Sequence, residues 1–244
     1  MSAMTRVAVA IPVYNEERAL PQTMPVLREF LAGPEFPYEW TIYIADNASI
    51  DKTPEVGREL ERQFPGEIEY VRIERKGRGY ALKKVWGDSA ADILSFMDTD
   101  LSTGLDAFPA LIKAVAEDGY DIAIGSRLME GAKVTRSLKR RILTFGYNNI
   151  IKGMFYTRFS DAQCGFKAVT REVADKIVPM IQDTNWFFDT ELLILAEKMD
   201  YRIKDVPVRW VEDTDTRVKI GGTIMEDVRG LIRMRRERPW RDRA

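Results

Sequence analysis

The chain has 244 residues, of which 45% are hydrophobic and 31% charged, and a formal net charge of −1 argues against a general affinity for nucleic acid. It contains no histidine and a single cysteine, Cys164. These counts exclude a histidine-dependent nucleophile, a cysteine zinc site and an intrachain disulfide. Any catalysis must therefore use carboxylates, cations, hydroxyl groups or a bound metal ion.

Short apolar segments alternate with helical patterns in the first half of the chain. Strands are expected at residues 6–14, 40–46, 68–74, 92–98 and 120–127, and helices at residues 15–32, 51–64, 77–89 and 104–118. Most of the strand segments are apolar in composition rather than alternating regularly with polar residues. This composition predicts an α/β fold with a mainly parallel sheet and helices on both faces.

The rhythm changes after Arg127. A long helix is expected at residues 137–159, a strand at 163–169, a helix at 187–199, a strand at 202–211 and a basic amphipathic helix at 222–239. We find no repeat, low-complexity segment or linker, so residues 1–244 are predicted to form one domain.

Polar clusters follow each of the first five predicted strands. In chain order they read VYNEE, ADNAS, RKGRG, MDTD and GSR. Open parallel sheets bind ligands at the carboxyl ends of their strands, so we expect these five clusters to form one pocket.

Two aspartates, Asp98 and Asp100, end the fourth predicted strand. Carboxylates this close repel each other unless a cation neutralises them. Oxygen ligands suit Mg²⁺ or Mn²⁺, which usually take one or two carboxylates and leave positions for substrate phosphates. The pair therefore predicts a divalent metal site, with an ordinary aspartate-rich turn as the alternative.

Other polar groups at these strand ends suit a nucleotide. Asp46 can accept hydrogen bonds from a ribose or a base, although a turn or helix cap is the alternative. Lys76 and Arg78 bring positive charge for phosphate, and the glycines of RKGRG permit close backbone approach. This segment lacks the spacing of a Walker loop.

The ordered motifs IPVYNEE, ADNASIDKT, KGRGYAL and DTDLS resemble the nucleotide-sugar half of the family 2 glycosyltransferases. In the second half GSR, RRILT, DAQCGFK and WFFDTELL are similar to the polyprenyl-phosphate branch, the dolichyl-phosphate glucosyl- and mannosyltransferases. The resemblance implies a GT-A fold, with a nucleotide-sugar half at residues 1–127, an acceptor half at 128–220 and a C-terminal helix at 221–244.

The resemblance also implies roles for individual residues. Asp98 and Asp100 would hold the metal, Asp189 aligns with the usual base position, and Arg217 resembles an arginine that reaches the donor diphosphate. Asp189 could instead orient the acceptor or cap the following helix. The donor-site residues would be Pro12, Tyr14, Glu16, Asp46, Lys76, Arg78 and Gly79, and the acceptor-phosphate residues Arg127, Arg140, Thr144 and Gln163.

Two positions depart from the family pattern. Asn47 stands where a second aspartate usually ends the second strand, and Ser102 stands where some mannosyltransferases have glutamine. Both departures bear on the identity of the donor more than on the type of reaction.

The expected activity is inverting, metal-dependent transfer of a hexose to a polyprenyl or dolichyl phosphate. The QCGFK motif favours UDP-glucose as the donor, with GDP-mannose next. One alternative is a glycosyltransferase with a soluble acceptor, which the absence of a run of roughly 18 apolar residues would favour. The other is a non-catalytic nucleotide-sugar-binding module recruited to membranes.

A lipid acceptor implies contact with a membrane. The predicted helix at residues 137–158 combines a basic start with apolar side chains such as Phe145 and Ile151. Such a helix suits the interface of an anionic bilayer, although core packing or a dimer contact is the alternative. We expect a peripheral protein on the cytoplasmic face of a membrane, and the sequence leaves its oligomeric state open.

Overall fold

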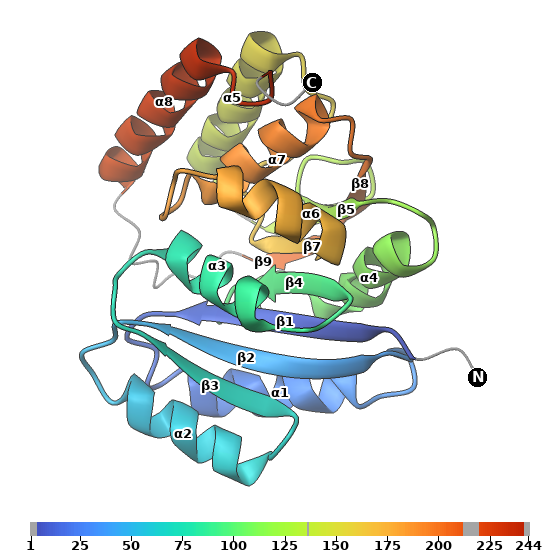
Figure 1. Ribbon diagram of the computed structural model, residues 1–244, viewed down its shortest axis with the longest axis vertical. Coiled ribbons are helices and arrows are strands. Elements are labelled where there is room, and N and C mark those ends of the chain that lie inside the picture. The colour runs from blue at the N-terminus through green and yellow to red at the C-terminus, as the bar shows by residue number, and fades with distance from the viewer. Residues whose placement is uncertain (1–3, 136, 212–219, 242–244) are drawn as a thin grey trace.

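The computed structural model describes residues 4–135, 137–211 and 220–241, without the side chains of residues 139 and 220–223 (Figure 1). The first half contains β1 (Arg6–Val13), α1 (Leu20–Leu31), β2 (Glu39–Asn47), α2 (Thr53–Gln63), β3 (Ile68–Ile73), α3 (Arg78–Asp88), β4 (Ile93–Met97), a 3₁₀ turn (Leu105–Ala107), α4 (Phe108–Ala116) and β5 (Ile122–Ser126). The second half contains β6 (Lys133–Thr135), α5 (Leu138–Phe155), β7 (Phe166–Thr170), α6 (Arg171–Ile177), a 3₁₀ turn (Val178–Met180), α7 (Phe188–Lys198), β8 (Ile203–Pro207), β9 (Arg209–Val211) and α8 (Ile220–Glu237).

The main sheet has seven strands in the order β3-β2-β1-β4-β7-β5-β8. All neighbours are parallel except β7, which runs antiparallel between β4 and β5. The α/β fold and mainly parallel sheet predicted from the sequence are therefore confirmed. Strands β6 and β9 form a second, parallel pair.

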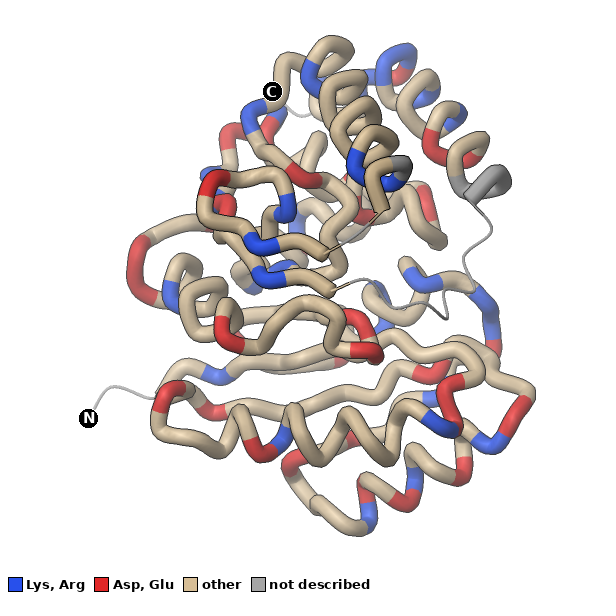
Figure 2. The backbone as a smooth tube through the Cα atoms, turned by 180° about the vertical axis from the view of Figure 1, so that it is seen from behind, with Lys and Arg blue, Asp and Glu red and all other residues tan. Residues whose placement is uncertain are grey.

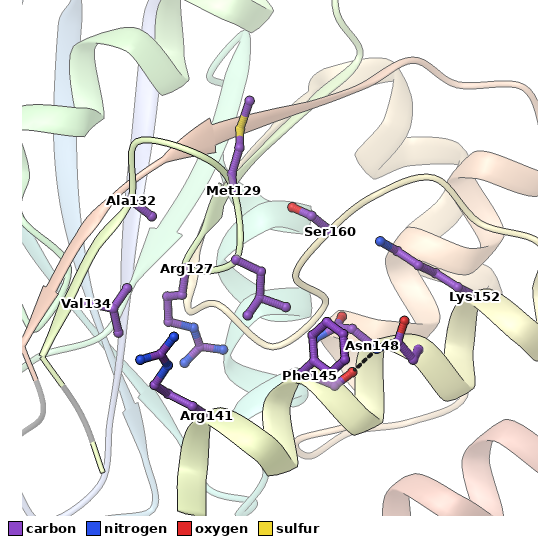
Figure 3. A pocket seen from close by; sticks show the side chains of 11 residues that line it. Arg127, Met129, Ala132, Val134, Arg141, Phe145, Asn148, Lys152 and Ser160 are labelled. Atoms are coloured by element: carbon purple, nitrogen blue, oxygen red, sulfur yellow. Dashed lines mark hydrogen bonds between the residues drawn. The ribbon is translucent and has the colours of Figure 1, made fainter. Parts of the chain in front are cut away.

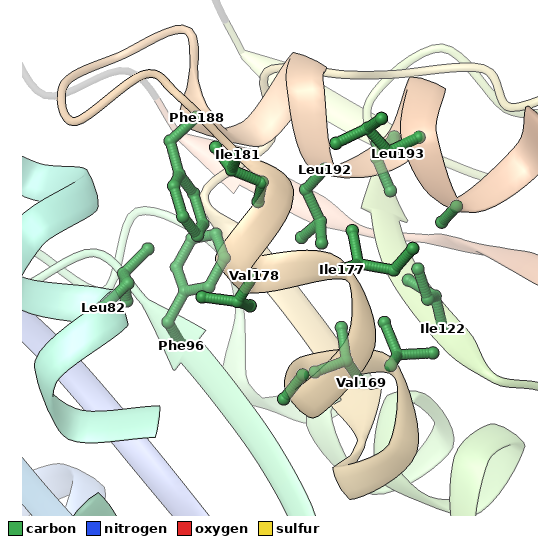
Figure 4. Packing of buried hydrophobic residues seen from close by; sticks show 14 of the residues in the cluster. Leu82, Phe96, Ile122, Val169, Ile177, Val178, Ile181, Phe188, Leu192 and Leu193 are labelled. Atoms are coloured by element: carbon green, nitrogen blue, oxygen red, sulfur yellow. The ribbon is translucent and has the colours of Figure 1, made fainter. Parts of the chain in front are cut away.

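Apolar side chains cover both faces of the sheet, as buried parallel strands require. In β1, Ala8 and Ala10 face the side covered by α3, α6 and α7, whereas Val7, Val9 and Ile11 face α1 and α4. On the first side Phe96 packs with Leu82 and Phe188 (Figure 4). Burial of each such side chain stabilises the folded state by about 1.5–3 kcal/mol, so the sheet is a stable support for the site.

Strands β1 and β4 separate at their carboxyl ends. Their pairing stops at Ala10–Phe96, whereas β1 stays paired with β2 as far as Val13. Pro12 lies in the unpaired stretch, where its missing N–H costs no hydrogen bond to β4. The strand order also reverses between β1 and β4, and open α/β sheets bind ligands at such a switch point.

Several element boundaries differ from the sequence prediction. The first helix begins at Leu20 rather than residue 15, because residues 15–17 bond to the loop after β2. Helix α5 ends at Phe155, where Tyr156 adopts a left-handed φ of 56° and ends the helical hydrogen bonding. The strand predicted at residues 202–211 divides into β8 and β9, and α6, which the pattern missed, is capped by the Thr170 hydroxyl.

Candidate active site

Beside the switch point, the loop after β1 is hydrogen-bonded to the loop after β2 and to the first residue of α2. Asn15 N–H donates to the Ser49 hydroxyl over 2.9 Å, and Glu16 N–H donates to the Thr53 hydroxyl over 2.8 Å. Tyr14 lies in the same loop with its ring 3.8 Å from the Lys76 ammonium, a cation–π contact. Tyr14 and Glu16 thus lie in one loop, and Lys76 contacts Tyr14; their role in binding a nucleotide stays a prediction.

Asp46 is fully buried at the end of β2. Its carboxylate accepts hydrogen bonds from the Tyr70 hydroxyl, from Arg72 over 2.7 Å and from Ser49 N–H over 2.9 Å. Burial alone would raise the pKa of Asp46, but these hydrogen bonds outweigh it and lower the pKa. In this structure the Asp46 carboxylate is therefore bonded to protein donors and is not exposed to a ligand.

The segment before α3 passes close to the loop before α7. Gly77 has a φ of +148°, its N–H donates to Asn47 Oδ1 over 2.7 Å, and a Cβ there would lie 2.4 Å from the Thr184 carbonyl oxygen. Gly79 also packs directly on the Thr184 backbone. Asn47, which stands where the resembled family usually has an aspartate, therefore holds the turn that precedes Arg78.

Arg78 joins two carboxylates in the centre of the site. Its guanidinium donates to Asp98 Oδ1 over 3.0 Å and to Asp189, and only 8% of its side chain is exposed. Asp189 lies between Arg78 and the fully buried Lys167, whose Nζ is 3.5 Å from Asp189 Oδ1. A buried chain of alternating charge, Asp98–Arg78–Asp189–Lys167, thus runs behind the site.

Asp98 lies where this chain reaches the surface. Its side chain is 47% exposed, yet partial burial by the surrounding protein raises its pKa. The negative charges of Asp100 and Asp189 raise the pKa further. Gly165 packs against Asp98 so closely that a Cβ there would lie 2.0 Å from Asp98 Oδ2. One carboxylate oxygen is thus bonded to Arg78, and the other lies against a residue that has no side chain.

Asp100 is exposed, and its Oδ1 accepts from Ser102 N–H over 2.9 Å. The next residues contact β9: Gly104 N–H donates to the Arg209 carbonyl over 2.8 Å, and Val211 N–H donates to the Ser102 carbonyl over 3.0 Å. Strand β9 therefore ends beside the turn that carries the two aspartates. Arg217, predicted to reach the donor diphosphate, lies outside the described residues.

Arg127 follows β5 and makes a bidentate ion pair. Its Nε and Nη2 donate to the two oxygens of Asp161 over 2.7 and 2.9 Å, and Asp161 is fully buried. Burial would raise the pKa of Asp161, but Arg127 outweighs it and lowers the pKa. The pair fixes Arg127 beside the site with its third nitrogen, Nη1, outside the two hydrogen bonds.

The other predicted acceptor residues lie in two places: Arg140 and Thr144 are on α5, and Gln163 contacts α8. Thr144 is buried on the face of α5 that carries Tyr147, whose hydroxyl lies 2.9 Å from the hydroxyl of Thr190. Arg140 is half-buried one turn earlier on α5. Gln163 instead donates to the α8 residue Asp227 over 3.0 Å, and burial raises the pKa of that carboxyl to about 7.

Sequence reasoning missed three residues that shape this site. Gly165 gives Asp98 its room, Asp161 fixes Arg127, and Arg72 covers Asp46. Gly165 lies inside the noted motif DAQCGFK, and a glycine beside a strand signals a close approach. Nothing in the chain pattern links Asp161 or Arg72 to their partners, which lie 34 and 26 positions away.

The paired aspartates suit a metal that is shared with a substrate. Among the described residues no group of three or more His, Cys, Asp or Glu side chains is placed to hold a metal ion. Asp98 and Asp100 nevertheless present carboxylate oxygen at an open edge of the sheet. This donor set suits Mg²⁺ or Mn²⁺, which complete their coordination with substrate phosphates and water.

The fold and these strand-end acids define a glycosyltransferase of the GT-A type. The model of the family "Glycosyl transferase family 2" matches residues 8–178, so the chain belongs to this family.

Curated relatives carry related names. The chain is 32% identical to the glycosyltransferase AglD of Haloferax volcanii over 94% of its own length and 36% of that protein. It is 34% identical to the dolichyl-phosphate beta-glucosyltransferase of Drosophila melanogaster, over 86% of this chain and 68% of the relative. The chain thus spans about a third of the first relative and two thirds of the second.

Solved structures share the fold. The mannosyltransferase PcManGT of Pyrobaculum calidifontis, in complex with GDP-Man and Mn²⁺, matches with a TM-score of 0.60 at 18% identity, over 92% of this chain and 61% of that one. Glucosyl-3-phosphoglycerate synthase of Mycobacterium tuberculosis, in complex with Mn²⁺ and UDP-glucose, matches with a TM-score of 0.66 at 15% identity, over 96% and 79%.

Proposed function

We propose that the protein transfers a hexose from a nucleotide sugar to a polyprenyl or dolichyl phosphate, with inversion at the anomeric carbon. UDP-glucose is the favoured donor and GDP-mannose the next. The observation that carries this proposal is the half-exposed Asp98, with Asp100 beside it, at the point where β1 and β4 separate. The relatives named dolichyl-phosphate beta-glucosyltransferase support the choice of glucose and of a lipid phosphate.

Asp98 and Asp100 would hold Mg²⁺ or Mn²⁺, which would neutralise charge on the departing diphosphate. Arg78 keeps Asp98 in place through its hydrogen bond, and Gly165 leaves room for the carboxylate. Tyr14, Glu16 and Pro12 lie on the β1 side of the opening, where the nucleoside would bind. We further propose that Arg217 reaches the diphosphate from the loop after β9.

The reaction needs no histidine. An oxygen of the acceptor phosphate attacks the anomeric carbon, and the electrons of the breaking bond pass to the diphosphate oxygen. The attacking phosphate is already ionised near neutral pH, so its placement matters more than proton removal. Asp189 is paired with Arg78 and Lys167, which supports a role in holding Arg78 rather than a role as a base.

A donor and acceptor screen tests this function. Purified protein is incubated with radiolabelled UDP-glucose or GDP-mannose and a short polyprenyl phosphate, with Mg²⁺, Mn²⁺ or EDTA. We expect labelled lipid from UDP-glucose, less from GDP-mannose and none with EDTA. A phosphorylated sugar acid tests for a soluble acceptor; labelling of that compound alone would overturn the lipid acceptor, and nucleotide binding without transfer would indicate the non-catalytic module.

Helices α5 and α8 lie side by side at one end of the molecule (Figure 1) and expose apolar side chains. On α5 the exposed fraction is 70% for Leu138, 62% for Ile142 and 52% for Ile150, and on α8 it is 50% for Ile232. Lys and Arg cluster at the start of α5 and in the second half of α8, and Lys152 lies near the end of α5 (Figure 2). Within the described residues, no helix is both long and apolar enough to cross a bilayer. We propose that these two helices bind the surface of an anionic membrane, on its cytoplasmic face.

Flotation with liposomes tests this surface. We expect the protein to float with anionic vesicles more than with neutral ones, and a Leu138→Ser/Ile142→Ser variant to bind at least about a hundredfold more weakly, because burying each of the two side chains contributes about 1.5–3 kcal/mol. Val26→Ser on α1 is the matched control, since Val26 is 53% exposed far from this end. If neither type of vesicle binds the protein, the apolar surface has another role.

A further inference from the structure

Trp186 is an exposed aromatic residue in the loop that precedes α7. It begins a run of three aromatic side chains, of which Phe187 and Phe188 are fully buried, whereas Trp186 is 43% exposed. A single exposed apolar side chain is common on protein surfaces, so the surroundings of the ring decide what it can do.

The loop that carries this ring is held by its neighbours. Asp183 N–H donates to the buried carboxylate of Glu191 over 2.9 Å, and Arg233 of α8 donates to the same carboxylate over 2.7 Å. The backbone of Thr184 packs on Gly79 at the start of α3. The exposed indole therefore stands on a backbone whose position is fixed by contacts with α3, α7 and α8.

The ring of Trp186 lies against Arg78, which is bonded to the first of the paired aspartates. The guanidinium carbon of Arg78 is 5.3 Å from the centre of the Trp186 ring and 4.7 Å from the centre of the buried Phe96 ring. The same guanidinium donates to Asp98 Oδ1 over 3.0 Å. These contacts place the centre of the Trp186 ring no more than about 10 Å from Asp98 Oδ1.

The hexose of a donor bound at Asp98 would lie within this distance. A divalent ion holds a phosphate oxygen about 2 Å away, and a single oxygen atom joins the distal phosphate of the donor to the sugar. The C–H groups on the faces of a hexose ring carry slight positive charge, whereas the face of an aromatic ring is negative. An exposed indole at this place therefore suits one face of a sugar.

Trp186 does not belong to the surfaces where the acceptor and its membrane are expected. A cavity of about 550 Å³ lies between the segment after β5 and α5 (Figure 3), and Trp186 is not among the described residues that line it. Arg127, predicted to bind the acceptor phosphate, lines this cavity together with Arg141. The apolar side chains proposed to meet the membrane lie on α5 and α8. These positions favour the donor over the lipid as the partner of the indole.

We propose that the Trp186 indole is a platform for the hexose of the donor, with one face of the sugar packed on the ring while Asp98 and Asp100 hold the metal on the diphosphate. The inference rests on the proposed function and makes it more specific, because it assigns a residue to the sugar itself rather than to the nucleoside or the phosphates.

Calorimetry with UDP and with UDP-glucose, both in the presence of Mn²⁺, tests this platform, because only the second ligand carries a hexose. Trp186→Ala should raise the Kd for UDP-glucose about tenfold, since the sugar loses its contact with a large aromatic ring, and should leave the Kd for UDP unchanged. The KM for UDP-glucose should rise by the same factor. Trp186→Phe keeps a flat aromatic ring and should restore most of the affinity.

Tyr120→Ala is the matched control. Tyr120 also makes a cation–π contact with an arginine, Arg202, but it precedes β5 and therefore lies at the opposite end of the sheet from Asp98. This variant should bind UDP and UDP-glucose as wild type does.

Two results would overturn the platform. If Trp186→Ala weakened UDP and UDP-glucose equally, the ring would support Arg78 and Asp98 or contact the nucleoside, and not the sugar. If donor binding stayed unchanged and only the KM for the polyprenyl phosphate rose, the ring would belong to the acceptor.

The inference and the proposed function can fail separately. If wild type transfers glucose and Trp186→Ala keeps the wild-type Kd and KM for UDP-glucose, the platform is wrong and the function stands. If Trp186→Ala weakens UDP-glucose alone but wild type never transfers sugar to the polyprenyl phosphate, the platform stands and the proposed reaction is wrong. Wild type that bound neither UDP nor UDP-glucose would overturn both.

Discussion

Asp98→Asn should reduce sugar transfer by about 10³-fold without unfolding the protein, since losing a metal-binding carboxylate removes several kcal/mol of stabilisation from the departing diphosphate. Asparagine keeps an oxygen that can accept the hydrogen bond from Arg78, so the side chain stays in place. Only the charge is removed. Turnover with the short polyprenyl phosphate and Mn²⁺-dependent binding of UDP, followed by calorimetry, should both be lost.

The melting temperature of this variant distinguishes a lost function from a lost fold. The pKa of Asp98 is raised in the folded state, so above the unfolded pKa its negative charge opposes folding. The neutral asparagine removes that cost, and the variant should melt at the same temperature as wild type or higher. Asp88→Asn, at an exposed aspartate paired with Lys84, is the matched control. Near-normal turnover in Asp98→Asn would remove this residue from the metal site.

Gly165→Ala should lower turnover by about 10²-fold, since misplacing a reacting group by about 1 Å can cost that much. The added Cβ would lie 2.0 Å from Asp98 Oδ2 and 2.5 Å from Asp98 Cγ, so the carboxylate has to move. It can move because its side chain is 47% exposed and borders open space. The fold should therefore survive while Mn²⁺-dependent binding of UDP weakens.

Gly87→Ala is the matched control, because a Cβ at this helical position meets nothing within 4 Å. It should keep full activity and raise stability slightly, by roughly 0.4–1 kcal/mol, through the reduced freedom of the unfolded chain. If Gly165→Ala transferred sugar at the wild-type rate and bound UDP with Mn²⁺ normally, the position of Asp98 would not matter for the reaction.

The sequence was most informative where a local pattern decides the structure. Apolar segments such as residues 92–98 predicted buried parallel strands, and the rule that ligands bind at the carboxyl ends of strands predicted that Tyr14 and Asp98 lie at the same end of the sheet. It failed at boundaries set by contacts across the chain. The helix expected from residue 15 starts five residues later, because the backbone N–H groups of Asn15 and Glu16 donate to Ser49, in the loop after β2, and to Thr53, the first residue of α2.

The sequence did not predict which side chains bond to each other. Arg78 was expected to bind phosphate, but its two carboxylate partners lie 20 and 111 positions away. Arg140 and Arg141 are adjacent in the chain, and the rotation of α5 about its axis determines that Arg141, and not Arg140, lines the cavity between α5 and the segment after β5. The roles of Arg78 and Arg140 as ligands of substrate stay predictions.

By itself the sequence determined the fold, the family and the edge of the sheet that carries the acids, because hydrophobic periodicity and strand-end composition are local properties of the chain. Only the tertiary structure decided that Asp98 packs against Gly165 and that Asp189 lies between Arg78 and Lys167. It also decided that a cavity lined by Arg127 and Arg141 opens beside α5. These features depend on distances between residues far apart in the chain, which are fixed when the sheet and its helices pack together.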